Sequence, residues 1–309
     1  MPARAGGMLA GMRDDPERFE ANRRRLFGLA YRLLGSAADA EDVVQEAYLR
    51  WSNRARMAAG PAVPEAWLTT VVTNLCLNLL GSARSRRERY VGPWLPEPVA
   101  TADGALGPLE TVEQRDSVSL GLLVLAERLT PRERAVFVLR EAFEYPYREI
   151  GLVLEVDEAH ARQLHRRARA RLDRPRRGQL VDRDAHALVV RRFLSAAVEG
   201  DLAGLEALLA ESVVSWADGG GEVGTARRPV EGRDRVLRYW LGLGGHPAAR
   251  AIRLDVTEVN GAPAAVLSDA DGVRAVVAVE VVEDRIVTVR LMASPTKLSY
   301  VAGQLAPRM

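Results

Sequence analysis

Cysteine, lysine and histidine are scarce in this chain of 309 residues. Cys76 is the single cysteine, which excludes an intramolecular disulfide and a thiolate zinc cluster. The 4 histidines are scattered without the spacing of metal ligands, so we expect no metal site and no cofactor. Lys297 is the only lysine, and arginine therefore carries almost all of the positive charge.

Long apolar runs are absent as well. No stretch approaches the length of a membrane span, and the N-terminal residues lack the apolar core of a signal peptide. At 48% hydrophobic residues, the chain is expected to be soluble and globular, and long enough for two or three domains. We therefore expect a cytoplasmic protein with no membrane partner.

Charge is segregated rather than abundant in one sign. The net charge is only +2, but basic blocks occur at Arg84–Arg89 and Arg162–Arg177, and acidic residues cluster at Asp39–Glu46. A general attraction to nucleic acid is therefore excluded, whereas local attraction at the basic blocks is not.

Residues 147–177 predict a helix, a tight turn and a second, arginine-rich helix that begins at Asp157 and Glu158. Each helix has an apolar stripe that leaves the arginines facing outward: Ile150, Val153, Leu154 and Val156 on the first, and Ala161, Leu164, Ala168 and Leu172 on the second. A helix-turn-helix places its second helix in the DNA major groove. The alternative is a solvated basic helix on an unrelated helical protein.

Helices are expected through the rest of the first half. The apolar spacing predicts helices at Arg23–Ser36, at Ala40–Trp51 with Asp39 as cap, and at Glu65–Ala83 after a polar loop Ser52–Pro64. A proline-rich linker of extended character follows from Pro93 to about Glu113. Helical spacing resumes near Ser117, and Thr130, Pro131 and Glu133 predict a capped start for a helix that runs to Ala142.

After Gly178 the pattern changes to two helices and then β-strands. The helices are expected at His186–Glu199 and Leu202–Leu209, and the strands at Val213–Trp216, Ala251–Val259, Ala264–Ser268, Val273–Val282 and Arg285–Met292. Helices followed by a run of strands indicate an α+β domain with a curved antiparallel sheet.

Three phrases in the first half resemble extracytoplasmic-function (ECF) sigma factors of bacterial RNA polymerase. Asp39–Ala47 resembles the region 2 helix that docks on the polymerase clamp, and Ala66-Trp67-Leu68 with Asn74-Leu75 resembles the helix that opens the −10 element. Leu129–Arg134 through Arg171 resembles region 4, which binds the −35 element. The resemblance implies two all-α domains, region 2 at 15–92 and region 4 at 116–178, joined by a linker at 93–115.

The same resemblance implies two partners, core RNA polymerase and promoter DNA, and it assigns candidate residues to each. Polymerase would be bound by the acidic helix face, through Asp39, Glu41, Asp42, Gln45 and Glu46. The −10 element would be bound by Asn53, Arg54, Arg56, Asn74, Arg84, Arg86 and Arg87, with the last three on phosphates. The −35 element would be bound by His160, Arg162, Gln163, Arg166 and Arg167. For each group the alternative is an ordinary solvated surface.

The C-terminal part, at 183–300, resembles the SnoaL-like cone of cystatin type that is fused to one ECF subgroup. Trp94-Leu95-Pro96-Glu97-Pro98 matches the linker motif of that subgroup, and Asp218-Gly219-Gly220-Gly221 matches its glycine-rich turn, although Glu222 stands where a basic residue is usual. Ser294-Pro295-Thr296-Lys297-Leu298 matches its terminal motif Asn-Pro-Asp-Lys-Leu with departures at Ser294 and Thr296.

The subgroup resemblance implies that this domain packs on the sigma core or on the linker and controls activity in cis. Its candidate regulatory residues are Trp94, Pro96, Asp218, Gly219, Gly220, Gly221, Pro295, Lys297 and Leu298. The alternative is that the glycine-rich turn merely joins two strands.

Other functions stay open at this point. SnoaL-like enzymes hold an acid–base residue in an apolar cone, which Asp218, His186, Trp216, Tyr239 and Trp240 would line here. Fold membership alone does not confer chemistry, so we expect no catalytic residue, while an unidentified small-molecule ligand in the C-terminal domain stays open. A stand-alone helix-turn-helix regulator with a ligand-binding domain is the main alternative to a sigma factor.

Overall fold

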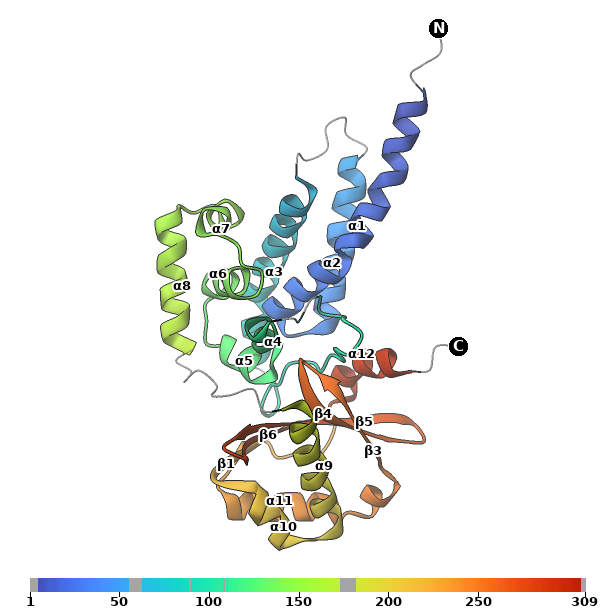
Figure 1. Ribbon diagram of the computed structural model, residues 1–309, viewed down its shortest axis with the longest axis vertical. Coiled ribbons are helices and arrows are strands. Elements are labelled where there is room, and N and C mark those ends of the chain that lie inside the picture. Colours follow the sequence, from blue (N-terminus) through green and yellow to red (C-terminus); the bar gives the residue numbers. More distant parts are fainter. Residues whose placement is uncertain are drawn as a thin grey trace. The chain divides into compact units, whose positions relative to one another are not determined.

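The computed structural model describes residues 5–55, 63–88, 90–107, 109, 111–172 and 182–306; of residues 5–15, 54–55, 82–88 and 112–113 only the backbone is described. The chain divides into two compact units (Figure 1). The first consists of Met1–Ser85 with Gly104–Asp173, and the second of Arg86–Asp103 with Arg174–Met309. The segment Arg86–Asp103, which leads from one half of the first unit to the other, therefore belongs structurally to the second, and from here on the term linker refers to this segment.

The described part of the first unit is helical. Its helices are α1 (Ala5–Leu34), α2 (Ala37–Ala55), α3 (Pro64–Glu88), α4 (Val112–Val118), α5 (Leu120–Ala126), α6 (Pro131–Glu141), α7 (Tyr147–Leu154) and α8 (Glu158–Leu172). The start of α6 is confirmed in detail, because Thr130 and Glu133 form a reciprocal capping box and Pro131 occupies the first turn. The predicted helix-turn-helix is confirmed as α7 and α8, with Asp157 Oδ1 accepting from the His160 amide at the start of α8.

Several helix boundaries differ from the sequence prediction. Ser36 rather than Asp39 caps α2, because the Ser36 hydroxyl accepts from the Asp39 amide at 3.1 Å and the helix begins at Ala37. The same helix continues to Ala55, so Asn53 and Arg54 lie in its last turns and not in a loop. Val156 lies beyond the end of α7, where Glu155 adopts a left-handed conformation with φ of 55°. Helical structure also resumes earlier than expected, at Val112 instead of near Ser117.

A buried arginine joins the two halves of the first unit. Arg32 of α1 is only 2% exposed and donates to Ser117 Oγ at 2.8 Å, Gly28 O at 2.9 Å and Leu106 O at 3.1 Å. Burial lowers the pKa of Arg32 to about 10. The approach is close, because a Cβ on Gly28 would lie 2.3 Å from the carbonyl oxygen of Leu106. Glycine at position 28 therefore allows α1 to touch the chain that follows the linker.

The second unit is an α+β domain, as predicted, but its sheet is mixed. The helices are α9 (Arg183–Glu199), α10 (Leu202–Leu208), α11 (Arg233–Gly244) and α12 (Pro295–Leu305), and the strands are β1 (Leu209–Asp218), β2 (Val230–Glu231), β3 (Arg253–Val259), β4 (Ala262–Asp269), β5 (Gly272–Val282) and β6 (Arg285–Met292). The strand order is β2-β1-β6-β5-β4-β3. The expected antiparallel sheet is wrong at one pair, because β1 and β6 are parallel.

The two faces of this sheet are covered differently (Figure 1). Helices α9, α10 and α11 pack on one face around a cluster that includes Phe193, Trp240, Val277 and Val289, whereas α12 packs against β5 on the other. Neither α11 nor α12 was predicted from the sequence. The end of β1, α12 and the linker meet on the second face.

Replacing Arg32 with Met tests the arginine connection in the first unit. We expect a local destabilisation of about 2–4 kcal/mol, because the backbone carbonyls of Gly28 and Leu106 lose their buried donor. Hydrogen–deuterium exchange of α4 and α6 peptides is the measurement. Arg23→Met, which removes an exposed ion pair with Glu20 on the same helix, is the matched control and should change exchange little. Equal effects of the two substitutions would contradict the assignment.

Candidate functional site

A buried ion pair lies where β1 ends and α12 begins. Lys297 Nζ donates to Asp218 Oδ2 at 2.7 Å, and the two side chains are only 8% and 0% exposed. Asp218 is the last residue of β1, and Lys297 lies in the first turn of α12. The Asp218 backbone carbonyl also accepts from the amides of Ala293 and Ser294, which ties the end of β6 to the same point.

The linker occupies the remaining hydrogen-bonding positions of this pair. The Tyr90 hydroxyl donates to Asp218 Oδ1 at 2.6 Å, the Leu95 amide donates to Oδ2 at 2.8 Å, and Lys297 Nζ donates to Leu95 O at 2.6 Å. Burial, together with the Asp218 carboxylate, raises the pKa of Tyr90 well above its usual range. Asp218 Oδ1 also accepts from the Gly220 amide. The carboxylate oxygens are therefore engaged with the linker, the turn and Lys297, and they do not face a cavity as an acid–base group would.

Two aromatic rings of the linker complete the surroundings of the ammonium group. Lys297 Nζ lies 4.5 Å from the centroid of the Tyr90 ring and 4.5 Å from that of the Trp94 ring. Both distances are within the range of a cation–π interaction, which is stronger in a desolvated site such as this. The single lysine of the chain is therefore in contact with the Asp218 carboxylate, the Leu95 carbonyl and the Tyr90 and Trp94 rings.

The glycine-rich turn allows the close approach of two other segments. Gly220 has φ of 64°, and a Cβ there would lie 2.7 Å from Ser294 Oγ at the start of α12. Gly221 has φ of 76°, and a Cβ there would lie 3.2 Å from the side chain of Val91 in the linker. The turn joins β1 to β2, but its glycines are also required by these neighbours.

The three departures from the subgroup motifs lie together. Glu222 Oε1 accepts from the hydroxyls of Ser294 at 3.0 Å and Thr296 at 3.2 Å. A carboxylate accepts and a hydroxyl donates, so the residues at these positions are chemically matched to one another. The departures thus preserve a polar contact between the glycine-rich turn and α12.

A second set of contacts holds the end of the linker. The side-chain amide of Gln304 pairs with Ala100, accepting from its N–H at 2.9 Å and donating to its carbonyl at 3.1 Å. Asn260, in the β3–β4 turn, likewise accepts from the Val99 amide and donates its own amide to the Val99 carbonyl. Gln304 follows Lys297 by seven residues, so the two side chains project from the same side of α12. No motif indicated Gln304, Asn260 or Tyr90, because each acts on linker backbone or on Asp218 from far away in the sequence.

The other predicted regulatory residues lie in or beside this cluster. Pro96 and Leu298 are buried, Pro295 is exposed at the first turn of α12, and Gly219 is buried within the turn. We call the contacts of residues 90–101 with Asp218, Asn260, Lys297 and Gln304 the linker clamp.

The helical surfaces of the first unit carry the other predicted residues. On α2, Glu41, Asp42 and Gln45 are exposed, and Asp39 and Glu46 are half-buried. Leu49, one turn beyond Gln45, is 51% exposed on the same face and was not predicted. On α3, Asn74 is half-buried. Arg56 lies outside the described residues, and the side chains of Arg54, Arg84, Arg86 and Arg87 are not described.

Helix α8 presents its predicted residues to solvent. Its apolar stripe is buried as expected, and the exposed side holds His160, Arg162, Gln163, Arg166 and Arg167. His165, which was not assigned a role, is buried on the opposite side.

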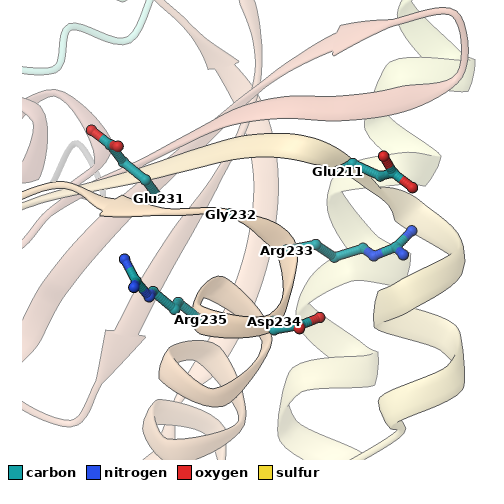
Figure 2. Close-up of a pocket in the computed structure, with 6 residues that line it drawn as sticks. All are labelled: Glu211, Glu231, Gly232, Arg233, Asp234 and Arg235. Carbon is teal, nitrogen blue, oxygen red and sulfur yellow. The ribbon is translucent and has the colours of Figure 1, made fainter.

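Several side chains that were expected to line an apolar cone contact their neighbours. The Trp240 indole donates to Ser215 Oγ at 3.0 Å and its ring packs on Phe193 at 5.0 Å, while His186 Nε2 lies 3.1 Å from the Val279 carbonyl oxygen. A separate hollow of about 320 Å³ is lined by Glu211, Glu231, Gly232, Arg233, Asp234 and Arg235 (Figure 2). Its lining carries both signs of charge and includes none of the predicted site residues.

The residues that the structure describes form neither a membrane-spanning helix nor a cluster of metal ligands. None of the helices there is long and apolar enough to cross a bilayer. Within those ranges no group of three or more His, Cys, Asp or Glu side chains has a geometry that would hold a metal ion.

Three family models match the chain in sequence order. They are Sigma-70 region 2 at residues 18–86, Sigma-70 region 4 at residues 120–172 and the SnoaL-like domain at residues 190–293. Together they define a sigma factor with a fused SnoaL-like domain.

Curated relatives agree with these matches. The ECF RNA polymerase sigma factor SigJ of Mycobacterium tuberculosis is 45% identical over 73% of this chain and 72% of its own length. The probable ECF RNA polymerase sigma factor SigI of the same species is 33% identical over 93% of this chain and 96% of its own. The crystal structure of Mycobacterium tuberculosis SigJ matches with a TM-score of 0.72 and 38% identity, covering 92% of this chain and 98% of that one.

The chain belongs to the ECF RNA polymerase sigma factors. It is a transcription initiation factor that binds core RNA polymerase and promoter DNA, and it is not an enzyme. The SnoaL-like domain is fused to the sigma domains in the same chain.

Replacing Lys297 with Met tests the linker clamp. The Asp218 carboxylate would stay buried without its counter-charge, at a cost of about 3–5 kcal/mol, and the Leu95 carbonyl would lose its donor. We expect faster amide exchange in peptides that cover residues 93–101, measured by hydrogen–deuterium exchange.

The matched control is Arg253→Met, which removes an exposed ion pair with Asp255 in the same domain. It should leave the exchange of the linker unchanged. A linker that exchanges at the same rate in the Lys297 variant as in the parent chain would show that the clamp does not hold it.

Proposed function

We propose that this sigma factor binds core polymerase through α2, melts the −10 element with α3 and the adjoining segments, and binds the −35 element with α8. We further propose that its SnoaL-like domain controls these steps by holding the linker. The observation that carries the second proposal is the linker clamp, in which Lys297 and Gln304 of α12 bind the linker backbone at Leu95 and Ala100.

The polymerase-binding face is the exposed side of α2. Glu41, Asp42 and Gln45, with the half-buried Asp39 and Glu46, provide negative charge and hydrogen-bond acceptors for a basic partner. Leu49 adds an exposed apolar side chain to the same face, which suits the centre of a protein interface better than open solvent.

The −10 element would be bound by residues at the ends of α2 and α3. Asn53 is exposed in the last turns of α2, and Asn74 is partly accessible on α3, so both amides are available to edges of unpaired bases. Arg54, Arg56, Arg84, Arg86 and Arg87 supply positive charge in the same segments, which supports phosphate contacts.

The −35 element would be bound by α8, where His160, Arg162, Gln163, Arg166 and Arg167 are all exposed. The second helix of a helix-turn-helix enters the major groove with its N-terminal residues toward the base edges. His160, Arg162 and Gln163 lie in the first two turns of α8, which favours them for base contacts over the later arginines.

Regions 2 and 4 are packed together in the first unit, and we propose that they separate when the protein binds a promoter. The −10 and −35 elements lie roughly 25 base pairs apart, or about 85 Å along the duplex at about 3.4 Å per base pair. A compact unit of this length has a radius of gyration of about 15 Å. Regions 2 and 4 in one unit cannot reach both elements, so we propose that contacts such as Arg32 to Ser117 and Arg25 to Tyr145 break on the promoter.

The linker clamp would control this opening through chain length. Arg86–Asp103 joins region 2 to region 4, and when free it can span up to about 60 Å at roughly 3.4 Å per residue. Held on the SnoaL-like domain, the same segment has one fixed span. Release of the clamp would therefore let region 4 adopt the separation that the promoter requires.

A small-molecule ligand is not part of this proposal. The aromatic side chains that would line an apolar cavity, Tyr239 and Trp240, pack on each other at 6.1 Å, and Trp240 also packs on Phe193. Control through the linker needs no such ligand.

Transcription in vitro with bacterial core polymerase tests the proposal. The full chain is compared with a form that ends at Gly178 and with Gln304→Ala, on the promoter upstream of its own gene. We expect specific initiation from all three, and several-fold more from Gln304→Ala than from the full chain, because the end of the linker is released.

Control by the SnoaL-like domain and the assignment as a sigma factor would be refuted by different results. Equal initiation by the full chain, the truncated form and Gln304→Ala would refute control by the SnoaL-like domain, with Arg253→Met as the unaffected reference. Binding to duplex DNA without any dependence on core polymerase would favour the stand-alone regulator instead.

A further inference from the structure

We propose that Tyr147 and His165 are positioning residues that hold the guanidinium group of Arg162 for contact with the −35 element. This inference rests on the proposed role of α8. It deepens that role by adding two residues that would not touch DNA themselves. Tyr147 begins α7, and His165 lies on the buried side of α8.

His165 joins three helices that lie together in Figure 1. Its Nε2 lies 2.8 Å from Glu141 Oε1 of α6, and its Nδ1 lies 2.9 Å from the Tyr147 hydroxyl of α7. The residue is only 6% exposed, and its ring packs on Phe137 of α6. Both ring nitrogens are thus engaged, and the orientation of α8 relative to α6 and α7 is set at this residue.

The direction of the hydrogen bond between His165 and Glu141 follows from the carboxyl group. The hydrogen bond from His165 holds the pKa of this carboxyl below its usual range, so the carboxylate is ionised near neutral pH and only accepts. Nε2 therefore donates to Glu141. Nδ1 and the Tyr147 hydroxyl share the second hydrogen bond, because a hydroxyl can either donate to an imidazole nitrogen or accept from it, and this contact fixes the ring of Tyr147.

The ring of Tyr147 in turn contacts Arg162. The guanidinium carbon of Arg162 lies 4.9 Å from the ring centroid, and that of Arg140 lies 5.0 Å from it. Arg162 also forms an ion pair with Glu158, one turn earlier on α8. With a side chain that is 61% exposed, Arg162 is held by a ring and a carboxylate but stays accessible to a partner.

This arrangement suits base recognition. A guanidinium that binds a guanine edge does so through two parallel hydrogen bonds, which require its plane at a defined position. A long side chain loses rotamer freedom when it is ordered, and a side chain that is already held loses less on binding. The chain from Glu141 through His165 and Tyr147 to Arg162 therefore prepares the arginine before DNA arrives.

The alternative is that these residues only stabilise the helix-turn-helix. The two explanations predict different effects on promoter preference. A loss of stability lowers transcription from every template, whereas a misplaced Arg162 relaxes the preference at one base pair. The test is transcription in vitro with the full chain and core polymerase, on templates that carry each single substitution in the −35 element.

The variants separate the ring from its hydroxyl. We expect Arg162→Ala to lose roughly tenfold of its discrimination at one −35 base pair, the order of one bidentate contact. Tyr147→Leu should lose discrimination at the same base pair, and adding it to Arg162→Ala should cause no further loss. Tyr147→Phe, which keeps the ring, and His165→Gln, which keeps a donor and an acceptor, should lose less than Tyr147→Leu and His165→Leu.

The control is Arg148→Ala, which removes an exposed arginine of α7 next to Tyr147 and should leave the −35 preference unchanged. Additive losses in the double variant, or an equal fall on all templates with Tyr147→Leu, would overturn the inference. An inert Arg162→Ala beside an Arg166→Ala that changes −35 preference would overturn it while sparing the role of α8. If no α8 substitution changes the preference, the proposed role of α8 itself fails.

Discussion

The ion pair between Asp218 and Lys297 is the contact on which the second unit depends. It connects three segments that are distant in sequence, namely the end of β1 with its glycine-rich turn, the start of α12 and the linker. Two charges removed from water are costly unless every remaining hydrogen-bonding position is filled. Here the linker supplies the missing partners, through the Tyr90 hydroxyl, the Leu95 amide and the Leu95 carbonyl. The domain therefore needs the linker to satisfy the hydrogen bonds of its own interior, and the proposed control through the linker would depend on these contacts.

A comparable dependence exists in the first unit, where Arg32 is buried under carbonyl groups from before and after the linker. Burial lowers the pKa of both Arg32 and Arg134, each to about 10, so both side chains keep their positive charge at physiological pH. The contacts that these two arginines make between regions 2 and 4 are polar and directional. Such contacts can exchange for water at a lower cost than exposing a large apolar interface, which suits the proposed opening of the unit. Polar contacts of this kind suit a sigma factor that alternates between a free and a promoter-bound form.

Local signals predicted the helices of the first unit well. The capping box at Thr130 and Glu133, the stripe of α8 and the turn at Asp157 all depend on residues within a few positions of one another. The errors also have local explanations, since Ser36 competes with Asp39 for the same cap and the polar residues after Trp51 suit a helix end as well as a loop. The parallel pairing of β1 with β6 could not be predicted, because strand direction in a sheet depends on connections through the whole domain. Helix α12 is not predicted, because the terminal motif at its start, Ser294–Leu298, covers little more than one helical turn.

By itself the sequence determined the family, the order of the domains and most of the exposed residues on α2 and α8, the helices proposed to bind polymerase and the −35 element. These follow from motifs and periodic patterns, whose information lies within one or two turns of a helix. Only the tertiary structure decided that Asp218 meets Lys297 and the linker, that Gln304 and Asn260 hold its far end, and that Glu222 accepts from Ser294 and Thr296. The tertiary structure also decided that the buried His165 contacts Tyr147, whose ring lies against Arg162. The physical reason is the same in each case: a hydrogen bond needs two groups within about 3 Å, and the fold alone brings together residues that are far apart in the chain.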